Sequence, residues 1–318
     1  MTHMRARSAT RAVVDALEKE GAAVLYDDEF TSWRDRLWAL AGLPVPRFVT
    51  LDGLPVHNTV IQNIEQLPHL LKLFAADTAL DKRAASGLLK LHSLTELYLE
   101  RSSLDNEVIV AIGRLATLQR LSLRGTTVDD HALSHLTGLQ ELRMLDLKST
   151  NVSQFDFGYR MQCRNLDTLI VDYTGVTDVA IRDIGKFSTL RHLSLEGTCI
   201  TDDAIAYIVV LSTLEELNLR NTLVTDTCIK DLRKLTSLKS LWLEATGVTS
   251  EGIRSLASLD SLECLHISGG TATVDSLLPL ARLHKLKELE IRGSVDADVP
   301  IKMLKRARPD LEVVVAPY

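Results

Sequence analysis

A cysteine, a histidine and a glutamate near the C-terminal end of the sequence have the residue types of a nucleophilic catalytic site. Cys264 and His266 are two residues apart, and Glu290 follows His266 by 24 residues. A cysteine activated by a histidine, itself oriented by a carboxylate, is a recurring arrangement for covalent catalysis. On one strand, however, the backbone would place Cys264 and His266 roughly 7 Å apart, too far for direct proton transfer. No oxyanion-stabilising loop is evident beside them, so the sequence predicts a protein that is not an enzyme.

The elements that must position these residues belong to a repeat that governs most of the chain. The first leucine of a Leu-x-apolar pair recurs every 24 residues, at Leu97, Leu121, Leu145, Leu169, Leu193, Leu217, Leu241, Leu265 and Leu289. Counting by the same interval leads back to Leu73 and Val49 and forward to Val313. A fixed period of this length is typical of a solenoid, in which each unit buries its apolar face against its neighbours.

Residues 190–213 show which elements one period predicts. Leucines alternate with polar residues from Leu190 to Glu196, which indicates a short strand with one buried face. Apolar residues then occur at every third position from Ile205 to Leu211, which indicates one stripe of a short helix. Neighbouring strands lie about 4.8 Å apart whereas packed helices need roughly 8 to 10 Å, so the stack must curve with its strands on the inside.

This pattern resembles the leucine-rich repeat superfamily, in particular the 24-residue form LxxLxLxxTxVTDxxIxxLxx, over residues 46–315. Threonine replaces the asparagine that the family more usually has at the turn, at Thr126, Thr150, Thr174, Thr198, Thr222 and Thr246. The resemblance implies an α/β fold: a right-handed leucine-rich repeat solenoid, or horseshoe, with a concave parallel β-sheet and short helices on the convex side. Since this fold hosts receptors, inhibitors and scaffolds alike, the resemblance does not identify the ligand.

The period divides the chain into three predicted parts. These are an N-terminal helical cap over residues 1–45, leucine-rich repeats over residues 46–300, and a C-terminal cap over residues 301–318. A terminal repeat has an apolar flank and an unpaired strand edge, both of which must be covered. We expect one helix that ends at Gly21, with Val13, Val14 and Leu17 on its buried face, and a second helix with Trp33 to provide this cover.

Composition narrows the classes of partner. The formal net charge of −6 disfavours nucleic acid, whose binding proteins usually carry a basic face. Cysteines 163, 199, 228 and 264 fall at four different phases of the repeat, which predicts reduced thiols and no metal or other cofactor.

The sequence has no apolar run of the ~20 residues that a membrane span needs and no secretory h-region, so we expect a cytoplasmic protein. The basic N-terminus leaves an organellar transit peptide as the alternative.

The exposed side of the predicted sheet carries the candidate binding residues. Side chains 24 residues apart stand on adjacent strands and form columns across the concave face. The residues predicted to bind a partner are Tyr98, Asp146, Ile170, Tyr173, Asn218, Arg220, Asn221, Trp242, Glu244 and His266. Trp242 is the strongest candidate, because a concave position adds nothing to the leucine core and interfaces are enriched in Trp, Tyr and Arg. The alternative interpretation of Arg220 and Glu244 is a ladder of lateral ion pairs that begins at Glu196.

These observations predict a non-catalytic protein–protein interaction scaffold that binds a partner protein on its concave face. We expect it to be a monomer or a subunit of a hetero-complex. One alternative is a substrate-recognition subunit of a ubiquitin-ligase-like complex; in the resembling F-box receptors that role needs an N-terminal adaptor helix pair, for which residues 1–45 show no convincing match. The other alternative is an enzyme that uses Cys264 and His266.

Overall fold

The computed structural model describes residues 12–26, 46–54, 58–67, 69–154, 163–293 and 298–317. The chain divides into two compact units. The first unit comprises residues 1–151 and 160–165, and the second unit comprises residues 152–159 and 166–318.

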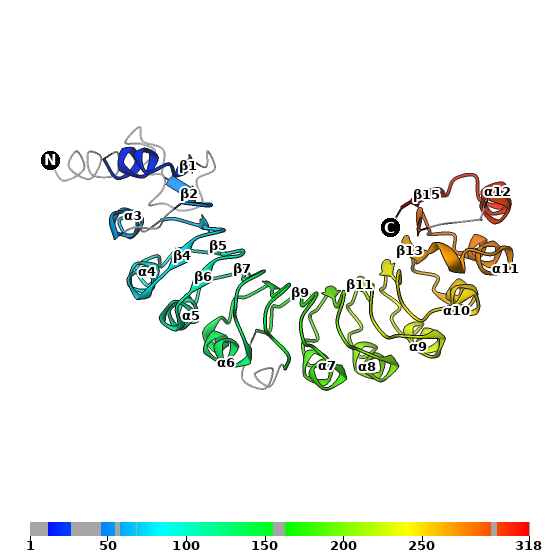
Figure 1. Ribbon diagram of the computed structural model, residues 1–318. Coiled ribbons are helices and arrows are strands. Elements are labelled where there is room, and N and C mark those ends of the chain that lie inside the picture. Colours follow the sequence, from blue (N-terminus) through cyan, green and yellow to red (C-terminus); the bar gives the residue numbers. More distant parts are fainter. Residues whose placement is uncertain are drawn as a thin grey trace. The chain divides into compact units, whose positions relative to one another are not determined.

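The first unit begins with a helix over residues 12–19 and continues with short strands and helices in alternation (Figure 1). Its strands are β1 (Ala23–Tyr26), β2 (Pro46–Thr50), β3 (Lys72–Phe74), β4 (Ala79–Leu80), β5 (Glu96–Tyr98), β6 (Ser103–Leu104), β7 (Arg120–Ser122) and β8 (Met144–Asp146). Its helices are α3 (Asn58–Ile64), α4 (Lys82–Leu88), α5 (Asn106–Ile112), α6 (Asp130–Leu133) and the 3-10 turn η1 (Ser134–Gly138).

The second unit continues the alternation. Its strands are β9 (Thr168–Ile170), β10 (His192–Ser194), β11 (Glu216–Asn218), β12 (Ser240–Trp242), β13 (Cys264–Ser268), β14 (Glu288–Arg292) and β15 (Glu312–Ala316). Its helices are α7 (Asp178–Ile184), α8 (Asp202–Ile208), α9 (Asp226–Leu232), α10 (Ser250–Ser255), α11 (Val274–Leu277) and α12 (Asp298–Ala307), with 3-10 turns η3 (Leu256–Ser258), η4 (Gly269–Thr271) and η5 (Leu278–Arg282).

Strand pairing within each unit follows the 24-residue period. In the second unit β9 to β15 pair in parallel in chain order, and Leu193 pairs with Leu217 as the repeat predicts. In the first unit β2, β3, β5, β7 and β8 pair in parallel in the same way. In each unit the strands line the inner side and the helices the outer side (Figure 1). The predicted α/β solenoid is confirmed.

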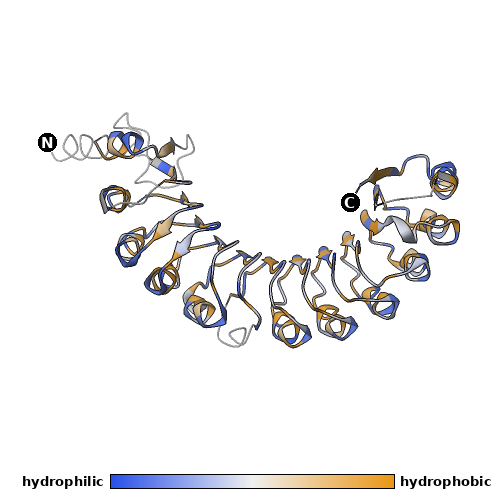
Figure 2. Cartoon of the chain, viewed as in Figure 1, coloured by the Kyte–Doolittle hydropathy of each residue, from blue (hydrophilic) through white to orange (hydrophobic). Residues whose placement is uncertain are grey.

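The leucines of the repeat form the core between strands and helices. Leu193 and Leu217 are 2% and 0% exposed, and Figure 2 shows hydrophilic residues along the outer faces of the helices. The threonine that replaces the family's asparagine is buried here because its hydroxyl has a partner in its own repeat. The Oγ1 atom of Thr198 donates to the carbonyl of Leu195 over 2.6 Å. The same bond recurs at Thr126, Thr150, Thr174, Thr222 and Thr246.

A left-handed residue turns the chain away from each strand. Positive φ angles recur every 24 residues, at Gly53, Asp77, Arg101, Gly125, Ser149, Tyr173, Gly197, Asn221, Ala245 and Gly293. Position 269 is the exception, because β13 runs on to Ser268 and the 3-10 turn η4 follows it. Two residues predicted to bind a partner, Tyr173 and Asn221, therefore owe their position to the turn of the repeat.

The N-terminal segment covers the first parallel strand. Val13, Val14 and Leu17 are buried on one face of the helix, and Gly21 has a φ of +93°, both as predicted. Strand β1 pairs antiparallel with β2, so the edge of β2 is occupied. The predicted helix with Trp33 lies outside the described residues. The domain boundaries at residues 45 and 300 stay predictions.

Near the C-terminus, Arg308 connects the end of α12 to the preceding repeat through hydrogen bonds. Its guanidinium donates to the carbonyls of Leu283 and Leu286 over 2.6 and 2.9 Å. The predicted last strand is present as β15, which pairs in parallel with β14. None of the helices in the described ranges has both the length and the apolar character that a membrane crossing requires.

Candidate functional site

Two of the ten predicted binding residues lie in the first unit, on β5 and β8, with β7 between these strands. Tyr98 on β5 stacks on Phe74 of β3, with ring centroids 4.8 Å apart and planes within 3°. Its hydroxyl donates to Glu96 over 2.9 Å. Burial is the larger cause and this hydrogen bond the second, and together they raise the pKa of Tyr98 to about 12. Asp146 ends β8 and accepts from the backbone amide of Lys148 over 2.9 Å.

The other eight lie in the second unit, on or just beyond β9, β11, β12 and β13. Strand pairing places Asn218 beside Trp242 and Trp242 beside His266, as the columns predict. Ile170 ends β9 two strands away from Asn218, because β10 lies between them. The repeat therefore brings these residues onto one face, which we call the second-unit face: the side chains of β9 to β14, and of the residues just after each of these strands, that lie on the side away from the leucine core.

A hydrogen-bonded network organises the β9 to β11 part of this face. Asp172 accepts from the Ser194 hydroxyl over 2.5 Å, and the Asn218 amide donates to the same hydroxyl oxygen over 3.1 Å. The Asn218 side-chain carbonyl accepts from the Arg220 backbone amide over 3.0 Å. These bonds hold Asn218 in one orientation.

The turn residues extend the network. Tyr173 is 46% exposed, and its hydroxyl donates to Glu196 over 2.6 Å, which raises the pKa of Tyr173. Arg220 lies 3.7 Å from Glu196, so this part of the predicted ladder of ion pairs is present. Asn221 is exposed and occupies the same turn position two repeats after Tyr173.

Trp242 ends β12 at the centre of the face. Its side chain is partly exposed, and its ring lies 5.4 Å from the His266 ring, centroid to centroid, with the planes tilted by 39°. The leucines on either side, Leu241 and Leu243, are buried in the core. The indole therefore lies on the opposite side of the strand from the core, as the alternation predicts.

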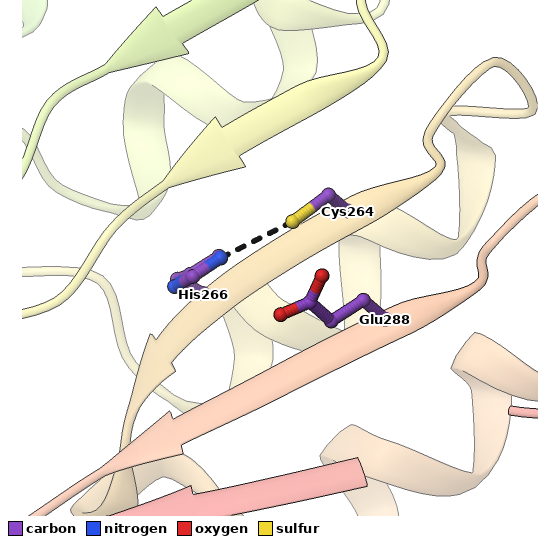
Figure 3. Close-up of side chains that lie close together, drawn as sticks. All are labelled: Cys264, His266 and Glu288. Atoms are coloured by element: carbon purple, nitrogen blue, oxygen red, sulfur yellow. Dashed lines mark hydrogen bonds between the residues drawn. The ribbon is translucent and has the colours of Figure 1, made fainter. Parts of the chain in front are cut away.

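Cys264 and His266 are closer than the strand geometry suggests. The Sγ atom of Cys264 lies 3.1 Å from Nε2 of His266 (Figure 3). The expectation that the pair is too far apart for proton transfer was therefore wrong. The estimate of roughly 7 Å holds for backbone atoms, but two side chains on the same face can lean toward each other, and the imidazole spans most of the gap.

The proximity does not produce an activated thiol. Burial, together with the charges of Glu288 and Glu290, raises the pKa of Cys264 to about 12. A cysteine nucleophile needs the opposite shift, because only the thiolate attacks. This high pKa supports the prediction that the protein is not an enzyme, which stays a prediction.

Glu244 and His266 are more buried than concave positions would suggest. Glu244 is 1% exposed and His266 is 8% exposed. Glu244 oxygen Oε1 lies 3.5 Å from Nε of Arg292 and 3.7 Å from Nδ1 of His266, and within the described residues neither carboxylate oxygen of Glu244 makes a hydrogen bond. The predicted ladder therefore stops at Arg220, which pairs with Glu196: among the described residues Glu244 lies within ion-pair distance of Arg292 and His266 instead of Arg220. Partner binding through Glu244 and His266 stays a prediction.

Arg292 also orders the carboxylate of Glu290. The Nε atom of Arg292 donates to Glu290 over 2.5 Å, and the second oxygen of Glu290 lies 2.9 Å from Nδ1 of His266. The latter contact has the length but not the alignment of a hydrogen bond. Glu290 therefore stands beside His266, as the 24-residue spacing predicts.

Arg292 and Glu288 were not among the residues predicted from the sequence, although the same column rule could have found them. Positions 244, 268 and 292 are 24 residues apart, and the middle one is Ser268. A serine is short enough to let Arg292 reach across β13 toward Glu244. Glu288 is the partner of Cys264 in the pairing of β13 with β14.

Known proteins resemble this chain in fold. No family model matches the sequence, and the search of curated proteins gives no match. An internalin (inlF) from Listeria monocytogenes str. 4b F2365 is similar in structure with a TM-score of 0.59 and 20% identity over 97% of this chain and 89% of that chain. The plant peptide hormone receptor RGFR1, in complex with RGF2, gives a TM-score of 0.45 and 14% identity over 85% of this chain and 55% of that chain. The leucine-rich repeat ectodomain of the Arabidopsis thaliana receptor kinase GASSHO1/SCHENGEN3 gives 0.47 and 15% identity over 83% and 37%.

The internalin likeness spans nearly the whole chain, and it agrees with the 24-residue period and the parallel strand pairing within each unit. The fold of this chain is that of the leucine-rich repeat proteins.

Proposed function

We propose that this protein is a non-catalytic protein–protein interaction scaffold that binds a partner protein on the second-unit face, around Trp242. The observation that carries the proposal is the placement of Trp242: a large aromatic side chain, partly exposed, on the side of β12 away from the core. Such a residue adds nothing to the leucine core. Tryptophans that a partner can cover completely are typical interface hot spots.

The surroundings of Trp242 support this role because they are already ordered. Asn218 is held by Ser194, and Arg220 is positioned beside Glu196. A binding surface whose side chains are fixed before association loses less conformational entropy when the partner arrives. Of the other predicted residues, Tyr173 and Asn221 are exposed and could contact the partner directly. Glu244 and His266 are buried and would instead hold Trp242 in position.

We further propose that the protein acts in the cytoplasm, as a monomer or as one subunit of a hetero-complex. Cys163, Cys199, Cys228 and Cys264 are all free thiols. Unpaired cysteines suit a reducing compartment, since disulfides form and persist mainly in oxidising ones.

The test compares two alanine variants in capture from a native lysate followed by calorimetry with the captured protein. Trp242→Ala removes the proposed anchor and should weaken binding by about 2 kcal/mol or more, which is roughly 30-fold in Kd. Val179→Ala is the matched control, because Val179 is 65% exposed on α7 in the same unit but on the helix side. It should bind like the wild type.

Equal capture and equal Kd for Trp242→Ala and the wild type would contradict the proposal. Thermal unfolding of both variants checks that the loss is not one of folding. We expect no loss for Trp242→Ala, since the indole is outside the leucine core.

A further inference from the structure

Three potential metal ligands meet on strands β13 and β14 of the second unit. The Sγ atom of Cys264, a ring nitrogen of His266 and a carboxylate oxygen of Glu288 all lie within 4.8 Å of one another (Figure 3). Cys264 and His266 share one face because they are two residues apart on β13, and Glu288 is the direct partner of Cys264 on β14. The extended strands therefore hold all three side chains on one surface without a loop.

The histidine is oriented for coordination. Its Nδ1 atom lies 2.9 Å from a Glu290 oxygen and 3.7 Å from a Glu244 oxygen, so the proton belongs on Nδ1, where two carboxylates stabilise it. A lone pair at Nδ1 would be repelled by the same oxygens. Nε2, on the other edge of the ring, then presents its lone pair toward Cys264, 3.1 Å away.

The groups behind the histidine are of the kind found in the outer shell of metal sites. Metal-binding histidines usually donate their second N–H to a carboxylate, which orients the ring and raises its basicity. Here the Glu290 carboxylate lies 2.9 Å from Nδ1, near enough for that role but not aligned for a hydrogen bond, and Arg292 holds Glu290 through a 2.5 Å hydrogen bond. His266 and Glu290 are 8% and 9% exposed, so this outer shell is buried while Cys264 and Glu288 are partly exposed.

We propose that Cys264, His266 and Glu288 bind one Zn²⁺ ion on the second-unit face. Thiolate, imidazole and carboxylate are the three side-chain ligands that zinc takes, with bonds of roughly 2.0 to 2.3 Å in tetrahedral geometry. Such bonds bring ligand atoms to about 3.5 Å from one another, so the ion draws in the flexible Glu288 side chain by about 1 Å. The thiol proton leaves to solvent as the Zn–S bond forms.

Three protein ligands leave the fourth tetrahedral position for a water molecule or for a side chain of a bound protein. This site departs from the expectation, drawn from the sequence, that the protein binds no metal. That expectation rests on the cysteines alone, which fall at four different phases of the repeat and so form no cysteine cluster. Two adjacent parallel strands reach a similar density of ligands through cross-strand pairing.

The test uses the purified full chain, stripped of metal with a chelator and then titrated with Zn²⁺ alone and with Co²⁺ alone. Calorimetry should give one Zn²⁺ per chain. Co²⁺ should give the visible spectrum of a tetrahedral ion together with a thiolate-to-cobalt charge-transfer band in the near ultraviolet. Cys264→Ser should abolish that band and weaken Zn²⁺ binding by about 100-fold or more, beyond the 10- to 100-fold typical of outer-shell changes.

Cys199→Ser is the matched control, because Cys199 is an exposed free thiol of the same unit that lies outside the cluster. It should keep the band and the affinity. Glu288→Gln tests the carboxylate and should weaken Zn²⁺ binding at least about 10-fold, and Glu290→Gln should do so by 10- to 100-fold through the orientation of His266. Circular dichroism verifies that each variant is folded.

A band that persists in Cys264→Ser, a band lost in Cys199→Ser, or the absence of stoichiometric Zn²⁺ binding by the wild type would each overturn the proposal. These measurements use no partner protein. The zinc site and the proposed scaffold function can therefore fail independently of each other.

Discussion

The strand faces of the two units have the same backbone pattern but differ in how deeply their charged side chains are buried. In the first unit the aromatic pair Phe74 and Tyr98 stacks closely, and the ion pair between Arg101 and Asp77 is exposed. In the second unit Trp242 packs at a tilt against a histidine, and Glu244 is almost completely buried next to an arginine and that histidine.

The difference shows that the repeat framework does not determine what its face can do. A buried carboxylate without a hydrogen bond costs free energy, and a solenoid core gains nothing from it. A buried polar group without a partner calls for an explanation, and a functional role is one. The second-unit face is therefore the better candidate for function, while the first-unit face has the inexpensive pairings of an ordinary surface.

The largest effect is expected where the shared framework itself is broken. Deleting residues 190–213 removes one complete repeat, and Asp178, which now accepts from Thr201, would then meet the equivalent Thr225. We expect a folded protein with a cooperative melt, because each repeat contacts only its neighbours. Deleting residues 190–201 places helix residues in strand positions and should give an unfolded or insoluble chain.

Solubility and circular dichroism show whether each of the two deletion variants is folded. A folded half-repeat deletion beside an insoluble full-repeat deletion would show that the register is wrong and that the two faces do not share one framework.

Removing one arginine from each face should sharpen the contrast between them. Arg292→Ala leaves Glu244 buried without its nearest cation, and we expect it to reduce the free energy of unfolding by about 2 kcal/mol. Arg101→Ala leaves Asp77 in solvent and should have a much smaller effect, because exposed ion pairs contribute little. Urea unfolding of both variants gives the comparison, and similar losses would show that Glu244 is not the more costly charge.

The aromatic pairs can be compared by double-mutant cycles. We expect the cycle of Phe74→Ala and Tyr98→Ala to give a coupling free energy of about 1 kcal/mol, because their rings are parallel and in close contact. The cycle of Trp242→Ala and His266→Ala should give less, since the tilted rings are 5.4 Å apart. A larger coupling in the second pair would mean that Trp242 serves stability rather than binding.

The smallest effect is expected from acid. The hydrogen bond from Arg101 lowers the pKa of Asp77, so this pair stabilises the fold fully above the unfolded-state pKa of about 4. The contribution disappears as the pH falls through the lower folded-state pKa. The difference in thermal midpoint between wild type and Arg101→Ala should therefore shrink from pH ~5 to pH ~2, and a constant difference would show that the ion pair is not its source.

Much of the second-unit face could be predicted from spacing. The alternation put Trp242 outside the core, and the 24-residue columns put His266 between Trp242 and Glu290, both as found. What spacing missed were contacts that depend on side-chain length. The column of positions 244, 268 and 292 aligns Arg292 with Glu244, but only the structure shows that the guanidinium reaches past Ser268 to that carboxylate.

The sequence by itself determined the fold class and the strand register, because these follow from a hydrophobic period repeated without insertion or deletion. It also determined the N-terminal helix, through the apolar face of Val13, Val14 and Leu17 and the stop at Gly21. Only the tertiary structure decided that Cys264 and His266 meet at 3.1 Å, that Glu244 is buried, and that Glu288 joins them. A period locates backbone atoms, whereas the rotamers of neighbouring side chains decide which of their polar atoms meet.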